Sequence, residues 1–256
     1  MKKKTISLTL AMIICGCEAV HLPIIANATG SAVINNDIKM QHEQYKSIEE
    51  QYEIFINSDF ATPEKIIKYE EMMEEHKAIA NGTYTPPTRS ADVKLGVPFR
   101  SQINSYYCGP ATVQQVRGYY YGTYQLPSQD TIAAALGTTT NGTEVQAVVN
   151  YLNANFSQTY AAQWYFSSAS NLYNFVAYDV ACYKPSVAFI TNTTYNNWLY
   201  SVAEHFLCFE GYVNDTTTNA YRIYVVDPFL NGHNIASGKY SVTWDDAYDV
   251  TYALIT

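Results

Sequence analysis

The sequence QINSYYCGPAT, residues 102–112, changes from a polar loop to a helical pattern at Cys108. Pro110 favours a helix start at this point, because the N–H that a proline lacks has no partner in the first helical turn. We therefore expect Cys108 at the positive end of a helix, where a thiol loses its proton more readily. The pattern predicts a thiolate nucleophile, with Gln102 and the backbone N–H of Cys108 as the candidate oxyanion hole.

A single cysteine also fits a buried small hydrophobe, so the catalytic interpretation depends on a second stretch. Residues 204–213 and 219–228 are rich in aromatic and β-branched side chains and flank a polar turn, which predicts a β-hairpin. Placing Glu210 opposite Arg222 pairs opposite charges across the two strands and fixes an expected register.

That register sets His205 opposite Asp227, close enough for the carboxylate to hold one imidazole nitrogen while the other faces the thiol. The sequence thus predicts a triad of Cys108, His205 and Asp227. His233 is the alternative base, but it lies in a polar turn, where an imidazole is held less firmly than on a strand.

The Gln-x5-Cys-Gly-Pro segment, the His-Phe pair before a Gly-Tyr strand and the later Asp-Pro pair resemble papain-like cysteine peptidases related to bacteriocin-leader (double-glycine) peptidases. The resemblance covers about residues 97–256. It implies an α+β papain-like fold, with helices packed on an antiparallel sheet. In that fold Cys108 is the nucleophile, His205 the base and then the acid, Asp227 orients the histidine, and Gln102 completes the oxyanion hole. Leader-processing members are fused to an export transporter, so their substrate does not carry over to this chain.

The N-terminus has the pattern of a secretory signal peptide, expected at residues 1–28. Lysines 2–4 precede a largely apolar run, and an Ala-x-Ala site ends at Ala28. A competing signal ends at Cys17, which would then be lipidated and would tether the protein to the cell surface. The mature chain is expected to be secreted or extracellular, and no other stretch is long and apolar enough to span a bilayer.

Residues 29–83 form an acidic segment with two expected amphipathic helices, the second capped by Thr62 and stopped after Asn81. Residues 84–94 are the expected linker, and residues 95–256 the peptidase domain. The helical segment is either an intramolecular pro-segment that shields Cys108 until the chain is cut near Arg89, or a helical arm.

Within the peptidase domain, the pattern predicts helices at 108–120, 129–136, 143–153 and 170–178, and further strands at 186–191, 239–243 and 250–255. Thr143 with Gln146 is the expected capping box of the third helix.

The composition fits an exported globular protein. Hydrophobic residues make up 48% of the chain, and the net charge of −8 argues against nucleic acid or anionic lipid as a partner. After removal of the signal, Cys108, Cys182 and Cys208 remain, and the last two are either two buried thiols or a disulfide. The spacing of Cys and His indicates no metal site, and no cofactor is expected.

These features predict a secreted cysteine peptidase that acts on a peptide or protein through an acyl-enzyme. One alternative is a non-proteolytic amide hydrolase or acyl transferase with the same triad. The other is a catalytically silent surface module that binds peptides.

Overall fold

The computed structural model describes residues 46–85, 91–193, 198–229 and 238–256. The expected signal peptide, Cys17, the expected cleavage point near Arg89 and His233 all lie outside these ranges. None of the helices in the described ranges is long and apolar enough to cross a membrane.

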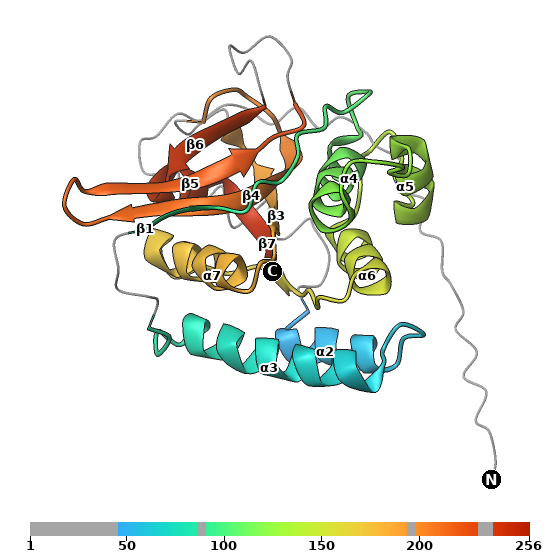
Figure 1. Cartoon of the computed structure of the whole chain (residues 1–256), viewed down its shortest axis with the longest axis horizontal. Helices are drawn as coiled ribbons and strands as arrows, with labels where there is room; N and C mark the ends of the chain where they lie inside the picture. Colours follow the sequence, from blue (N-terminus) through green and yellow to red (C-terminus); the bar gives the residue numbers. More distant parts are fainter. Residues whose placement is uncertain (1–45, 86–90, 194–197, 230–237) are drawn as a thin grey trace, which may run out of the picture. The chain divides into compact units, whose positions relative to one another are not determined.

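Helices and strands follow an α+β order (Figure 1). The helices are α2 (Ile48–Ile56), α3 (Pro63–Ala80), α4 (Cys108–Tyr121), α5 (Gln129–Leu136), α6 (Val145–Asn155), α7 (Ala169–Ala181) and α8 (Trp244–Val250). The strands are β1 (Ala91–Lys94), β2 (Ala162–Gln163), β3 (Ser186–Thr191), β4 (Glu204–Asp215), β5 (Ala220–Val226), β6 (Lys239–Thr243) and β7 (Thr251–Ile255). The predicted α+β class, with helices packed on an antiparallel sheet, is confirmed.

Within the described ranges, seven strands form one antiparallel sheet in the order β2-β7-β3-β4-β5-β6, and β1 also pairs with β4. Residues 91–94 were expected in the linker, but they form β1 along the second half of β4. Gly211 makes this pairing possible, because a Cβ at that position would lie 2.0 Å from the carbonyl oxygen of Val93.

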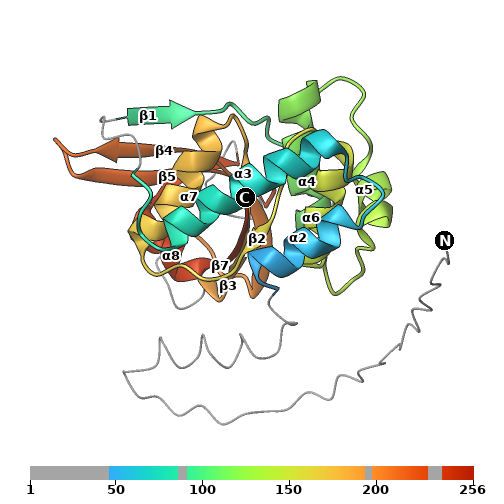
Figure 2. The ribbon, with the colours of Figure 1, turned by 90° about the horizontal axis from the view of Figure 1, so that it is seen from below.

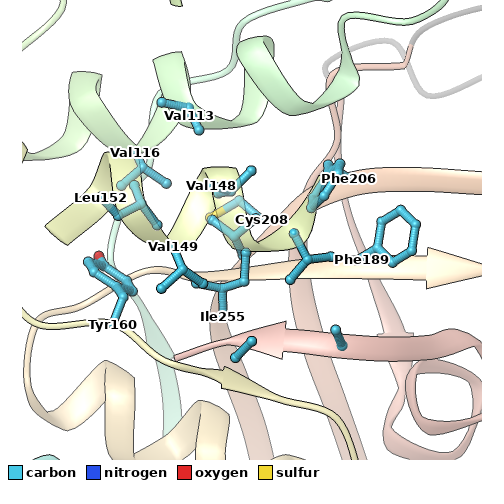
Figure 3. Packing of buried hydrophobic residues seen from close by; sticks show 14 of the residues in the cluster. Val113, Val116, Val148, Val149, Leu152, Tyr160, Phe189, Phe206, Cys208 and Ile255 are labelled. Atoms are coloured by element: carbon cyan, nitrogen blue, oxygen red, sulfur yellow. The ribbon is translucent and has the colours of Figure 1, made fainter. Parts of the chain in front are cut away.

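The sheet is covered by helices on both faces, so the middle parts of its central strands, residues 187–190 of β3 and 206–209 of β4, are apolar. One core lies between the sheet and helices α4, α5 and α6, where Val113, Val148 and Leu152 pack over Phe206 and Cys208 (Figure 3). The other core joins α7 and α8 to the alternate residues of the same strands, among them Leu207 and Phe209. Strand β4 is therefore fixed from both sides.

Most helix boundaries follow the expected capping chemistry. Thr62 caps α3 through the N–H of Lys65, and Ser128 caps α5, which ends at a left-handed Gly137. The predicted capping box at Thr143 is wrong. Its hydroxyl is instead 2.8 Å from the hydroxyl of Thr138, and α6 starts at Val145 without a side-chain cap.

The predicted hairpin exists as β4 and β5, but its predicted register is wrong. Cys208 lies opposite Val226 rather than Tyr224, a displacement of two residues, and the register shifts again at Glu210. Glu210 is the extra residue of a β-bulge. It pairs with Lys239 at 3.1 Å and accepts the N–H of Val97 at 2.7 Å instead of pairing with Arg222.

The helices α2 and α3 belong to the same compact unit as the sheet, Tyr45–Thr256. Figure 2 shows α3 lying across α7. The Asn171 side chain of α7 donates to the carbonyl oxygen of Ile79 at 2.8 Å. The buried Gln51 accepts the N–H of Ala162 at 2.7 Å and donates to its carbonyl oxygen at 2.8 Å. Gln51 thereby completes the hydrogen bonding of the short edge strand β2.

We expect Gln51→Ala to lower the free energy of unfolding by about 1–3 kcal/mol, because it leaves a buried N–H and C=O of β2 without partners. Urea unfolding measures this loss. Glu53→Ala, an exposed site on the same helix, is the matched control and should stay within about 0.5 kcal/mol of the parent. Equal stability of the two variants would contradict the role given to Gln51.

Candidate active site

Cys108 is the first residue of α4, as the sequence predicts, and it is 9% exposed. The helix is tied to the sheet by Thr112, whose hydroxyl donates to the carbonyl oxygen of Phe206 at 3.1 Å. No side chain caps the helix start at Tyr107. The thiol therefore lies at the positive end of a helix that is anchored one residue away from His205.

His205 and Asp227 are brought together as the sequence predicts, with 2.8 Å between Nε2 and Oδ1. Both residues are buried. Continuing the observed register would set Asp227 opposite Leu207, so His205 and Asp227 are diagonal rather than opposite neighbours. The contact survives the wrong register because a shift by two residues keeps every side chain on its face of the sheet.

The electrostatics favour an ion pair between thiol and imidazole. Burial raises the pKa of the Cys108 thiol, but the hydrogen bond and charge of His205, with backbone groups of Phe206 and Gly109, lower it below its ordinary value overall. Burial lowers the pKa of His205, yet the charge and hydrogen bond of Asp227, with a smaller effect of Cys108, raise it to about 10. Because Nε2 is held by Asp227, Nδ1 is the ring nitrogen that serves the thiol.

The Asp227 carboxylate stays ionised although it is buried. Burial raises its pKa, but the charge and hydrogen bond of His205 and the hydroxyls of Tyr200 and Tyr240 lower the pKa overall. Sequence reasoning missed both tyrosines. They are two of 24 tyrosines in the chain, and no local pattern distinguishes them from tyrosines that serve packing.

Gln102 lies in the loop before Cys108, and its backbone N–H donates to the carbonyl oxygen of Pro228 at 3.0 Å. This bond joins the loop to the segment that follows Asp227. The Gln102 side chain donates to the carbonyl oxygen of Asn104 at 2.8 Å, which uses one of its two amide protons. The role of Gln102 in an oxyanion hole stays a prediction.

A pocket of about 150 Å³ opens beside the thiol. Its walls come from the loop before α4, the turn between α5 and α6, and the strands β3 and β4, namely Ser105, Tyr106, Cys108, Thr140, Asn141, Gly142, Thr143, Phe189, Glu204 and Phe206. Gly109 lets this turn approach α4, since a Cβ there would lie 2.6 Å from Oγ1 of Thr143.

The other described cysteines lie outside the site. Cys208 is buried in the core beneath α4, and burial raises its pKa well above the ordinary value. Cys182 is exposed, so the expectation of two buried thiols is correct only for Cys208. Neither forms a disulfide with another described cysteine.

Comparison with known proteins places the chain in a family. The model of the Peptidase_C39 like family matches residues 94–252, and the chain belongs to this family. The predicted membership of a double-glycine peptidase-like family is confirmed. Family membership supports a cysteine-type hydrolase.

Similar solved structures include three proteases. A double glycine motif protease from an AMS/PCAT transporter, in complex with the leader peptide, is 16% identical with a TM-score of 0.42, over 67% of this chain and 95% of that one. The proform of the ragweed pollen cysteine protease Amb a 11 is 9% identical with a TM-score of 0.45, over 81% and 92%. Digestive procathepsin L2 of Tenebrio molitor is 12% identical with a TM-score of 0.44, over 88% and 99%. No curated protein matches the chain.

Alkylation of Cys108 by iodoacetamide at pH 7 should be faster than that of an ordinary thiol, because the hydrogen bond and charge of His205 lower the pKa of the Cys108 thiol. The pKa of His205 is raised to about 10, so the imidazole carries its charge at pH 7. In His205→Ala, the imidazole no longer offsets the effect of burial on the Cys108 thiol, so the pKa of Cys108 rises. The labelling rate of Cys108 at pH 7 then falls by about tenfold or more. Mass spectrometry resolved by site measures both rates, with the exposed Cys182 as the internal control. Unchanged labelling of Cys108 in the variant would rule out the ion pair.

Proposed function

We propose that this protein is a secreted cysteine peptidase that hydrolyses peptide bonds through Cys108, His205 and Asp227. The observation that carries the proposal is the buried His205, which contacts Asp227 at 2.8 Å and at the same time lowers the pKa of a thiol at a helix start. Such a charge arrangement is typical of an activated sulfur nucleophile. Family membership agrees with this chemistry.

In the proposed reaction, the Cys108 thiolate attacks the carbonyl carbon of the scissile bond and forms a C–S bond. The negative oxygen of the tetrahedral intermediate is bound by the backbone N–H of Cys108 and the Gln102 amide. His205 gives its proton to the leaving nitrogen as the C–N bond breaks.

A water molecule then attacks the thioester and gives one proton to His205. The C–S bond breaks, the carboxylic acid product leaves, and the thiolate and imidazolium are restored. Asp227 keeps its charge throughout and fixes the ring of His205.

The proposal also assigns roles to the expected signal peptide and to the helices α2 and α3. The expected signal peptide would direct the chain to the outside of the cell, with lipidation at Cys17 as the alternative anchor. Among the residues that the structure describes, the walls of the pocket beside Cys108 include none from α2 or α3. These helices cover β2 and α7 instead. This placement supports a helical arm that stays with the enzyme over a pro-segment that shields the thiol.

Incubation of the mature protein with a diverse peptide library should produce new peptide termini, read by mass spectrometry. Cys108→Ala should produce none, because the nucleophile is gone, and His205→Ala should lower kcat by about 10²- to 10⁴-fold through loss of the acid and base. Cys182→Ala removes an exposed thiol outside the site and is the matched control, with full activity expected.

The same digests test the alternatives. Wild-type protein that binds peptides without cutting them would identify a silent binding module and overturn the proposal. Cleavage that persists in Cys108→Ala would mean that another group carries the reaction.

A further inference from the structure

The Asp227 carboxylate is held on both of its oxygens. Oδ1 accepts from His205 Nε2 at 2.8 Å and from the backbone N–H of Phe229 at 2.8 Å. Oδ2 accepts from the hydroxyl of Tyr240 at 2.6 Å and from the hydroxyl of Tyr200. We propose that Tyr200 and Tyr240 are positioning residues of the active site: by holding Oδ2 they turn Oδ1 toward His205, and so keep the imidazole aimed at Cys108. This inference rests on the proposed function of the same site.

Tyr200 comes from the segment between β3 and β4 and is 4% exposed. Its backbone carbonyl oxygen accepts from the hydroxyl of Thr193 at 2.7 Å, which ties the segment to the end of β3. Its ring lies 5.2 Å from the ring of Phe229 and 6.1 Å from the ring of His205. The hydroxyl therefore has little freedom to leave the carboxylate.

Tyr240 comes from β6 and lies opposite Val225, in the strand that leads to Asp227. Its ring is 6.1 Å from the ring of Trp198, which belongs to the same segment as Tyr200. The sheet thus brings together a loop after β3 and the edge strand β6 at one carboxylate. No local feature of sequence connects these segments.

Both tyrosine hydroxyls can donate a hydrogen bond to Asp227 over the whole working pH range. Burial and the charge of Asp227 raise the pKa of Tyr200 and Tyr240, so each hydroxyl keeps its proton at any pH at which a peptidase works. His205 and these two tyrosines lower the pKa of Asp227, and Cys108 in turn contributes to the raised pKa of His205.

Removal of a hydroxyl has two expected effects. The carboxylate of Asp227 loses a donor that favours its charged form, so its pKa rises and it becomes protonated at a higher pH. Once protonated, Asp227 no longer holds the imidazolium of His205 by its charge. The acid limb of kcat/KM consequently moves to higher pH. The carboxylate also gains freedom to rotate, so kcat at neutral pH falls by about tenfold for each hydroxyl.

The experiment compares Tyr200→Phe, Tyr240→Phe and the double variant with the wild type. It records kcat/KM against pH on a cleaved peptide, and the alkylation rate of Cys108 against pH by mass spectrometry resolved by site. Tyr224→Phe is the matched control, because Tyr224 on β5 donates to the exposed Asp92 at 2.9 Å. Its profiles should overlay those of the wild type.

Profiles of both single variants that overlay the wild type, in protein that cleaves peptides, would overturn the positioning role and leave the peptidase proposal intact. If the wild type cleaves no peptide, a shift of the Cys108 alkylation profile in the variants still supports the positioning role, while the peptidase proposal fails. Tyr240 is only half-buried, so Tyr240→Phe decides the question if Tyr200→Phe does not fold.

Discussion

The contact between His205 and Asp227 is the interaction on which the site depends. A carboxylate buried without partners is too costly to remain ionised, and removing one partner of a buried pair costs about 3–5 kcal/mol. Here Asp227 is fully buried and keeps its charge through a histidine, a backbone N–H and phenolic hydroxyls. The charge in turn raises the pKa of His205, and the resulting imidazolium lowers the pKa of Cys108.

The sheet makes this contact possible because its central strands are packed from both faces. Alternate residues of β4 belong to two different cores, so a slip of one residue would exchange Phe206 and Cys208 with Leu207 and Phe209. The β-bulge at Glu210 accommodates the extra residue of β4. It lies between the hairpin turn and the end of β4 that carries His205. The buried Glu210 carboxylate forms an ion pair with Lys239 and accepts a hydrogen bond from the N–H of Val97.

The N-terminal helices pack against the edge strand β2 of the sheet and against α7. Gln51 completes the edge strand β2 with its side-chain amide, and Ile79 of α3 contributes to the core around α7. The two N-terminal helices are thus packed as part of the same fold that carries the site. The pocket beside Cys108 is shaped instead by Gly109, whose missing Cβ admits Thr143.

The sequence by itself determined the position of Cys108 at a helix start, the α+β class, most helix boundaries and the pairing of His205 with Asp227. These depend on local capping chemistry and on the alternation of apolar residues, which neighbours along the chain already specify. Only the tertiary structure decided the hairpin register, strand β1, the use of Thr143 in the pocket wall and the tyrosines on Asp227. Each of these depends on segments that are distant along the chain, whose meeting is set by the packing of both sheet faces, and no local pattern encodes it.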